Sequence, residues 1–399
     1  MAAHQLIPDI SFAEVLEADS TTLRSNLKEH SLKVFQPTNH KELRLFSSKE
    51  AASWIGITDS YLRQLVSGGD VPTTSKALAG RHLFSLEDIH AARRWLGTKK
   101  ASYIPNRRDG DKLQSIAVAN FKGGSGKTTT SIHLAQYLAM RGFRVLAVDL
   151  DPQASFTTLM GFNPEFDVAD RGTIWGALEY DDARRVPLSK IIKDTYVVGL
   201  DLVPANIELQ EFEWQTASEA GNGNPVARQF HKRIASALLE VESNYDVVVF
   251  DCPPQMGYLT LSAMCAATSF ILSVHPQMLD IASMSQFLNM SNDMIDVFTK
   301  KGLNLRYDWM RYLITRHEPH DIPQINVVTF LRTMFRERVL GPMMVKSTAI
   351  SDAGLYKQTL YDIDREKMNR GTYERAIESV NAVNNEFERL ILAGWGRAE

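Results

Sequence analysis

The sequence predicts an α/β protein in which a mostly parallel sheet is flanked by helices, with a smaller helical unit before it. Two observations predict this fold. From about residue 113 onward, short apolar runs alternate with helical patterns, which is typical of parallel strands connected by helices. One such run leads through a glycine-rich segment at 122–126 into a helical pattern, and this strand–turn–helix unit is the geometry of a phosphate-binding loop.

Length and composition set the first limits. The chain has 399 residues, more than a single compact core usually holds, so two or three domains are expected. Its net charge is -3, so contact with nucleic acid would depend on local basic patches. The only two cysteines, Cys252 and Cys265, exclude a disulfide framework and a cluster held by paired cysteine ligands. The first nine residues lack the features of a secretory signal, and we expect a cytoplasmic protein.

Residues 1–40 form the first predicted unit, an N-terminal helical arm. Ile10, Phe12, Val15 and Leu16 follow helical spacing, and a second pattern runs from 23 to 32. The segment is too short to hold a core by itself. It is either a dimerisation arm or a helix that packs on its own domain, and the sequence does not distinguish the two.

Residues 41–100 form the second predicted unit. Ser47 stands three residues before Glu50, which is the spacing of a capping box at a helix start. Gly56 ends that helix, and Thr58 begins another that ends at Gly68. Two helices joined by a tight, glycine-containing turn are typical of a DNA-binding helix-turn-helix.

The rest of this unit completes a winged helix-turn-helix pattern. The segment 81–84 predicts a short hairpin or wing, and a third helix is expected from Ser85 to Leu96, ending at Gly97. Between 41 and 109 there are twelve Lys and Arg against seven Asp and Glu, a basic excess that favours DNA binding. We expect Arg63 and Gln64 of the second helix to contact operator bases and Arg81 to contact phosphate. Residues 101–112 are predicted to be a linker.

The predicted ATPase domain spans 113–399. Strands are expected at 116–119, 144–148, 197–202, 247–250, 270–274 and 312–314. The stretch between Asp251 and Asp280 has no charged residue but contains Pro253, Pro254 and Pro276. A spanning helix would need about 20 largely apolar residues without such breaks, so interior α/β structure is expected there, with no membrane contact.

The glycine-rich segment carries the predicted nucleotide chemistry. Backbone N–H groups of such a loop bind phosphate, a lysine neutralises it, and a following hydroxyl binds a magnesium ion. The lysine here is Lys127 and the hydroxyl is Thr128. The residues expected to bind the nucleotide are Lys122, Gly123, Gly124, Ser125, Gly126, Lys127, Thr128 and Thr129.

Three acids follow two of the predicted strands. Asp149 and Asp151 end one apolar run, and Asp251 ends another. An isolated acid after a strand usually caps the next helix. Open α/β sheets, however, place ligands at the carboxyl ends of their strands, where the glycine-rich loop is also expected. The three segments together therefore indicate a site for a nucleoside triphosphate and Mg²⁺.

The loop departs from the standard phosphate-loop pattern. Phe121 stands where the first glycine is expected, and an additional lysine, Lys122, precedes Gly123. The run Lys-Gly-Gly-X-Gly-Lys-Thr-Thr resembles the deviant phosphate loop of the ParA and MinD class of ATPases. This resemblance implies an ATP-bound homodimer in which Lys122 reaches the partner subunit's nucleotide. It also implies that Lys122 and Lys127 are catalytic cations, that Asp151 orients the attacking water, and that Thr128 and Asp251 hold Mg²⁺.

The N-terminal helix-turn-helix pattern is also part of the resemblance. With it, the chain most resembles the RepA proteins of RepABC-type plasmid replicons, which are a subclass of ParA partition ATPases. The resemblance implies slow hydrolysis of ATP to ADP, stimulated by a ParB-type partner resembling RepB. It also implies specific operator binding as an autorepressor, non-specific DNA binding in the ATP state, and a nucleoid-associated location in the cytoplasm.

A basic segment at 330–338 is a further candidate DNA surface. Arg332 and Arg336, with Arg338, could line one helix and contact DNA phosphates, or simply form a solvated helix face. Lys346 fits either this surface or the pocket for the base.

Two other functions remain open from the sequence. A MinD-like positioning ATPase would bind membranes through its C-terminus, but the polar face at 386–392 is not basic. A repressor that senses nucleotide without significant turnover would not need the second acid at Asp151.

Overall fold

The computed structural model describes residues 11–34, 41–71, 82–300, 305–364 and 368–397. The chain divides into two compact units, residues 1–41 and 42–399. In the first unit, α1 (Phe12–Val34) is one continuous helix, whereas the sequence showed two helical patterns. No glycine or proline interrupts these 23 residues, so the two patterns join. Dimerisation through this arm stays a prediction.

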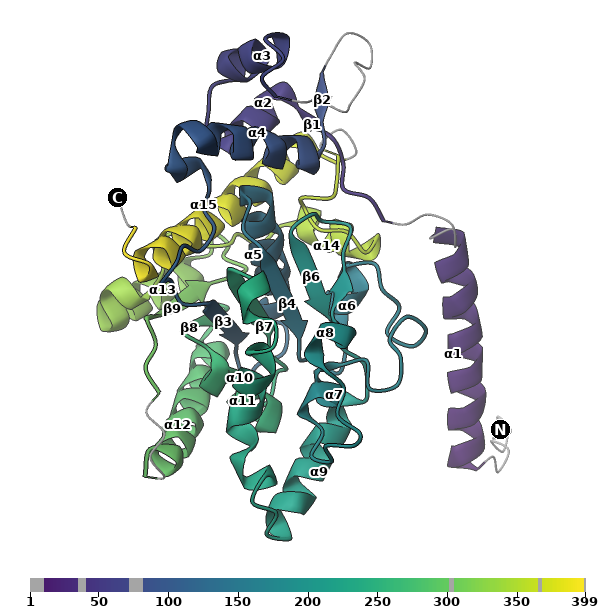
Figure 1. The fold of residues 1–399 in the computed structure, drawn as a ribbon. Helices are drawn as coiled ribbons and strands as arrows, with labels where there is room; N and C mark the ends of the chain where they lie inside the picture. The colour runs from purple at the N-terminus through teal and green to yellow at the C-terminus, as the bar shows by residue number, and fades with distance from the viewer. Residues whose placement is uncertain (1–10, 35–40, 72–81, 301–304, 365–367, 398–399) are drawn as a thin grey trace. The chain divides into compact units, whose positions relative to one another are not determined.

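A seven-stranded sheet forms the centre of the second unit (Figure 1). Its strand order is β5-β6-β4-β7-β3-β8-β9, and all neighbouring pairs are parallel except the edge pair β5–β6. This confirms the mostly parallel sheet. The strands are β3 (Gln114–Ala119), β4 (Val145–Asp149), β5 (Lys193–Asp194), β6 (Leu200–Val203), β7 (Val247–Asp251), β8 (Ser269–Val274) and β9 (Trp309–Ile314).

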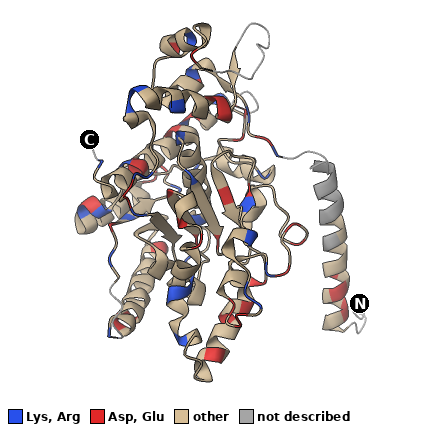
Figure 2. Ribbon diagram, viewed as in Figure 1, with Lys and Arg blue, Asp and Glu red and all other residues tan. Residues whose placement is uncertain are grey.

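Both faces of the sheet are covered by helices. Four of the five inner strands, β3, β4, β7 and β8, are therefore buried on both sides and consist largely of apolar residues. One face packs against α5 (Lys127–Arg141) and α15 (Arg370–Gly394). The other packs against α9 (Leu209–Gly221), α11 (Tyr258–Ala266), α12 (Met278–Lys300) and α13 (Ile322–Phe335). Lys, Arg, Asp and Glu residues lie mainly on the surrounding helices and loops (Figure 2).

Shorter helices complete this unit. They are α6 (Ser155–Leu159), α7 (Ile174–Leu178), α8 (Leu188–Ile191), α10 (Arg233–Leu238) and α14 (Thr348–Leu355), with 3-10 turns at Ala101–Tyr103, Ala227–Lys232, Glu242–Asn244 and Arg336–Arg338. The uncharged stretch after Asp251 forms α11 and β8, as expected. Among the described residues, no helix has the length and apolar character needed to cross a membrane. The C-terminal α15 instead buries its apolar side against the sheet.

The segment before the sheet contains the predicted helices. The first, α2 (Ser48–Ile55), begins at the capping box of Ser47 and Glu50 and ends at Gly56, whose φ is +87°. The next, α3 (Asp59–Ser67), is capped by Thr58. Strands β1 (Phe46–Ser47) and β2 (Leu83–Phe84) pair antiparallel. Residues 72–81, including Arg81 at the start of the predicted wing, lie outside the described residues.

The third helix of this segment is longer than the sequence indicated. Helix α4 (Leu86–Lys99) begins at the Ser85 cap as expected but continues past Gly97. A Cβ at Gly97 would lie 2.4 Å from Cγ1 of Ile104. The glycine therefore permits close packing of the following chain and does not end the helix, and the prediction of an end at Gly97 was wrong.

Residues 42–100 share a core with the sheet domain. The ring of Trp54 at the end of α2 packs edge-on against Tyr137 of α5, with 5.5 Å between centroids. The Trp54 carbonyl accepts hydrogen bonds from the guanidinium groups of Arg93 and Arg141. Arg141 also forms an ion pair of 2.9 Å with the nearly buried Glu388 of α15. These contacts join the N-terminal helices directly to the helix that begins at the phosphate loop.

The segment predicted as a linker is also held in place. The buried carboxylate of Asp246 accepts hydrogen bonds from the Asn106 side chain at 2.6 Å and from the Arg107 backbone at 3.0 Å. Arg397 near the C-terminus donates to the carbonyl oxygens of Pro105 and Asn106. In the second unit, residues 101–112 are therefore bonded to the sheet domain at several points.

Candidate nucleotide site

The phosphate loop connects β3 to α5 and depends on two left-handed glycines. Gly124 has a φ of +75°, and Gly126, which precedes the first turn of α5, has a φ of +83°. Residues with a side chain rarely adopt these angles. A Cβ on Gly126 would also lie 3.3 Å from Thr315. The glycines thus let the loop turn tightly, so that the unpaired N–H groups of the first turn of α5 face the space above the sheet.

The loop is fastened from two neighbouring strands. Thr315, directly after β9, donates to the Ser125 carbonyl at 2.7 Å. The buried Ser125 hydroxyl lies 3.1 Å from that of Ser273 on β8. Asn120 also donates to the Ser273 carbonyl. Ser125 therefore supports the loop through its side chain and carbonyl, and only its backbone N–H is left for a nucleotide.

Lys127 is poised for an anion. Its side chain is 6% exposed, and its ammonium group donates to the Lys122 carbonyl at 3.1 Å. Burial lowers the pKa of Lys127, while the nearby carboxylates of Asp251 and Asp151 oppose this shift. A buried cation at the start of a helix can stabilise phosphate strongly because little water screens it.

Two acids end adjacent strands in register. Asp149 of β4 pairs with Asp251 of β7, and both are buried. Asp251 Oδ1 accepts from Ser131 of α5 at 2.9 Å, but Oδ2 has no hydrogen-bond donor among the residues that the structure describes. Burial raises the pKa of Asp251, which Thr128, Ser131 and Lys127 oppose only in part. A divalent cation beside Thr128 would satisfy Oδ2, so the residues present fit Mg²⁺.

Asp149 has a role that the sequence did not reveal. Its Oδ2 accepts from the Thr157 backbone and hydroxyl at 2.9 and 2.7 Å, and its Oδ1 accepts from the Asp151 backbone at 3.1 Å. Asp149 therefore holds the segment that carries Asp151. The sequence predicted that Asp149 ends a strand, but the hydrogen bonds of Asp149 to Thr157 depend on the fold of the loop.

The phosphate loop, Lys127 and Asp151 line one cavity of about 800 Å³, whereas Ser125, Asp149 and Asp251 are not among its lining residues. Of the residues predicted to bind nucleotide or water, the lining includes Gly123, Gly124, Gly126, Lys127, Thr128, Thr129 and Asp151. The lining also includes residues 315–316, 318 and 344–348. Lys346 lies here, paired with Glu318 at 2.9 Å, so the structure puts it beside the nucleotide cavity. Of these residues, sequence reasoning had identified only Lys346 as a candidate.

Lys122 points away from this cavity within its own chain. Its ammonium group forms an ion pair of 2.8 Å with Asp280 at the start of α12. The Asp280 side chain is 2% exposed, and that of Lys122 is 38% exposed. His275 lies 3.8 Å from the same carboxylate. Asp280 is a functional candidate that the sequence missed, because 158 residues separate it from Lys122.

The predicted DNA-contacting residues lie elsewhere. Arg63 and Gln64 are exposed on α3, and Arg63 forms an ion pair with Asp59 at 2.6 Å. Arg332 is on α13 and donates to the Gly341 carbonyl at 2.8 Å. The helix ends at Phe335, and Arg336 has a φ of +48°. The expected single helix through 330–338 was therefore wrong, and Arg332 and Arg336 lie on different elements.

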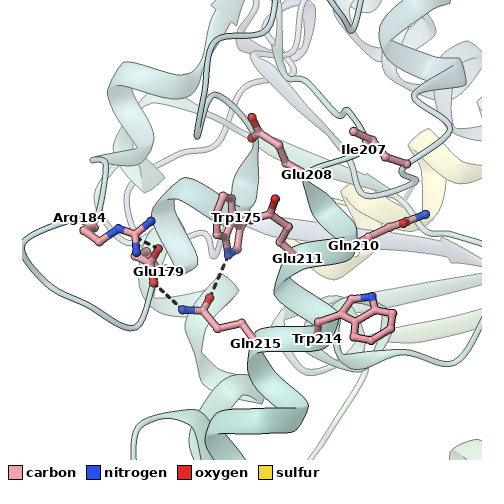
Figure 3. Close-up of a pocket in the computed structure, with 9 residues that line it drawn as sticks. All are labelled: Trp175, Glu179, Arg184, Ile207, Glu208, Gln210, Glu211, Trp214 and Gln215. Atoms are coloured by element: carbon pink, nitrogen blue, oxygen red, sulfur yellow. Dashed lines mark hydrogen bonds and ion pairs between the residues drawn. The ribbon is translucent and has the colours of Figure 1, made fainter.

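A second cavity, of about 530 Å³, lies beside α7 and α9 (Figure 3). Its lining contains three glutamates, Glu179, Glu208 and Glu211, and one arginine, Arg184. Glu179 is bonded to Gln215 at 2.8 Å. This predominance of acids is unsuited to a polyphosphate, and none of the predicted site residues lines it. The first cavity is therefore the nucleotide-site candidate.

Magnesium binding should release a proton from this site near neutral pH. Burial raises the pKa of Asp149 and of Asp251, so the folded, ligand-free protein holds protons that the unfolded chain has lost. Stability from this source is present at low pH and is lost as pH rises through the folded pKa values. Above about pH 6.5, where ordinary histidines are mostly neutral, the ligand-free protein should become less stable as pH increases.

Calorimetric titration with Mg²⁺ and ATP in two buffers of different ionisation enthalpy measures the proton release. The wild-type protein should release more protons than Asp251→Asn, whose amide has no proton to lose. Equal release by both proteins would contradict the assignment of Asp251 to the cation.

Comparison with known proteins agrees with this site. Residues 113–305 match a protein family described as an AAA domain. The chain is 48% identical over 391 residues to "Putative replication protein A" of Rhizobium rhizogenes, covering 97% of this chain and 96% of that protein. It is 33% identical over 238 residues to the sporulation initiation inhibitor protein Soj of Bacillus subtilis, covering 60% of this chain and 86% of Soj.

Solved structures show the same fold. One named "Partition Protein" has a TM-score of 0.65 and 16% identity, covering 94% of this chain and 98% of that one. Cobyrinic acid a,c-diamide synthase from Mycobacterium smegmatis, with a bound ATP analogue and magnesium, has a TM-score of 0.50 and 28% identity, covering 61% and 94%. The first likeness extends through nearly the whole chain.

Proposed function

This chain belongs to the ParA family of partition ATPases and resembles the RepA proteins. We therefore propose that it is a plasmid-partition ATPase that also represses transcription at its own operator. The observation that carries the ATPase part is the nucleotide site: two left-handed glycines and the buried Lys127 line the cavity at the start of α5. Asp251, whose Oδ2 has no donor among the described residues, is bonded to Ser131 of the same helix. ATP or ADP with Mg²⁺ fits this set of donors and acceptors.

Each residue has a distinct task in this proposal. Lys127 and the loop N–H groups bind the phosphates, and Thr128 and Asp251 hold the metal. Mg²⁺ supplies charge neutralisation at the phosphates when it is bound. Asp151, which lines the cavity beside Gln153, orients the attacking water. Asp149 positions Asp151 through the backbone hydrogen bond at 3.1 Å.

Asp151→Ala should lower the rate of ATP hydrolysis by about 100-fold, within the range for loss of a positioned acid–base group, while ATP binding remains. The ATP-bound dimer should therefore accumulate. Sedimentation velocity with ATP and steady-state phosphate release measure the two effects. Asp181→Ala, which removes an exposed acid that does not line the cavity, is the control. A variant that hydrolyses ATP at the wild-type rate would contradict the role of Asp151.

Dimerisation on ATP is the proposed switch. Lys122 would leave Asp280 and contact the partner subunit's nucleotide, and DNA binding would follow in the dimer. Sedimentation with ADP and with a slowly hydrolysed ATP analogue, each with and without random duplex DNA, tests this proposal. ATP-specific dimers that bind DNA would support it, and analogue-bound monomers would contradict it.

Operator binding is proposed for the N-terminal segment. Helix α3 is exposed on the side of Arg63 and Gln64 and packs through Leu62 and Leu65, which suits a recognition helix in the major groove. Arg63→Ala should weaken operator binding by about tenfold, since one base contact contributes about 1–3 kcal/mol, and should leave ATP hydrolysis unchanged. Footprinting on the chain's own promoter measures this, with Lys49→Ala as a control. An unchanged footprint would contradict the role of Arg63.

Non-specific DNA binding is proposed for the arginines near α13. Arg332 and Arg336 are both exposed, so each could contact phosphate although they lie on separate elements. Hydrolysis would be accelerated by a ParB-type partner bound to DNA. A nucleotide-sensing repressor would instead bind its operator without turnover even with DNA and partner present, and a MinD-like protein would bind liposomes in an ATP-dependent manner.

A further inference from the structure

An arginine beside the phosphate loop has an unusual backbone conformation. Arg316 is the second residue after β9, lines the nucleotide cavity and is exposed. Its φ is +53°, in the left-handed region that residues with a Cβ rarely occupy. Such conformations persist only where neighbouring contacts impose them, and they cluster at functional sites.

Contacts on both sides impose this conformation. The Thr315 backbone N–H donates to Val274 at 2.9 Å, and the His317 backbone N–H donates to Met344 at 3.0 Å. The chain must turn between these two anchors. The turn carries the Arg316 side chain over the phosphate loop, where Nη1 donates to the Gly124 carbonyl at 3.0 Å.

The charge of Arg316 is not balanced by a neighbouring acid. Lys346, which also lines the cavity, is paired with Glu318, and Lys122 of the phosphate loop is paired with Asp280. Among the described residues, no carboxylate lies within 4.0 Å of the Arg316 guanidinium, and its one hydrogen bond goes to a neutral carbonyl. A guanidinium has five N–H donors, so most of them remain available at the edge of the cavity.

The charge of Arg316 also acts on His275. Burial lowers the pKa of His275, and the charges of Arg316, Lys122 and Lys346 lower it further, against the opposing effect of Asp280. Arg316 therefore adds positive charge at this end of the cavity. An anion entering this end of the cavity would be attracted to it.

We propose that Arg316 binds the phosphate chain of the nucleotide, as a cation of the site additional to Lys127 and Lys122. The proposal rests on the proposed function, since it names a further contact of the same nucleotide. In the ligand-free protein Arg316 braces Gly124; with nucleoside di- or triphosphate bound, its planar group also donates to phosphate oxygens, for which arginine is well suited. Arg316 is therefore a discriminating residue that favours nucleotides with more phosphates.

Replacement by glycine tests the proposal without straining the backbone, because glycine adopts a positive φ readily. Arg316→Gly should fold with at least the thermal stability of the wild type. Its affinity should fall about 10- to 100-fold for ATP and ADP, the range for loss of a charged hydrogen bond, and should remain within about twofold of wild type for AMP. Arg316→Lys keeps the positive charge but loses the planar guanidinium. Its affinities for ATP and ADP should lie between those of the wild type and those of Arg316→Gly. Equilibrium titration with fluorescent ATP, ADP and AMP measures all three.

Arg375→Ala is the matched control, since Arg375 is exposed on α15 and also donates to a backbone carbonyl, that of Gly371. Its affinities should equal those of the wild type. Wild-type affinity of Arg316→Gly for ATP would overturn the proposal. So would an equal loss for ATP, ADP and AMP, because a residue that only braces the loop would affect all three alike. Failure of the wild-type protein itself to bind ATP would instead overturn the proposed function.

Discussion

Lys127→Ala should lower the affinity for ATP by about 100-fold, which corresponds to about 2.7 kcal/mol. The Lys127 side chain is 6% exposed, so its interaction with phosphate is poorly screened by water and belongs to the stronger class of charged hydrogen bonds. In the ligand-free protein its ammonium group is bonded only to the Lys122 carbonyl at 3.1 Å among the described residues. Phosphate could therefore bind the Lys127 ammonium group without the loss of an existing ion pair.

Equilibrium titration with a fluorescent ATP analogue measures this loss. The fold should survive, because burial already disfavours the charged form of Lys127 and alanine removes that penalty. Thermal unfolding of the ligand-free variant checks this expectation. Lys190→Ala, an exposed lysine of α8, controls for the general loss of positive charge. ATP affinity within twofold of the wild type would refute the assignment of this cavity.

Lys122→Gln should abolish ATP-dependent dimerisation while leaving ATP binding nearly intact. If Lys122 reaches the partner subunit's nucleotide, its charge contributes only in the dimer. A switch from mostly monomer to mostly dimer requires a preference of up to about 10⁴-fold, or about 5.5 kcal/mol, and the loss of two symmetric charged contacts removes a term of that order. Glutamine is chosen because its amide can still donate to the nearly buried Asp280, which alanine would leave without its partner.

Sedimentation velocity at saturating ATP separates this outcome from a folding defect, and Asp280→Asn is the matched control. That change removes the acid that holds Lys122 within its own chain at 2.8 Å. It should therefore preserve or strengthen the dimer. A Lys122→Gln protein that hydrolyses ATP at the wild-type rate would exclude the role across the interface, and the ion pair with Asp280 would then be a structural contact.

The helices near the N-terminus show which structural features depend on the local sequence and which depend on packing between distant residues. Three features depend only on residues within a few positions of each helix, and the sequence predicted all of them: the capping box at Ser47, the end of α2 at Gly56 and the Thr58 cap. Gly97 is a glycine like Gly56, yet α4 continues past it. Its reason is the contact with Ile104, which no local pattern contains.

The sequence by itself determined the parallel sheet, the phosphate loop and the acids at strand ends, because each depends on short contiguous runs of residue type. Only the tertiary structure decided which distant groups meet that loop. Asp280 is 158 residues from Lys122 in the chain, and Arg316 is 192 residues from Gly124. It also decided that Trp54 packs on α5 and that Asp149 supports Asp151. The physical reason is that strand register and helix packing bring together side chains whose separation along the chain leaves no periodic or local signal.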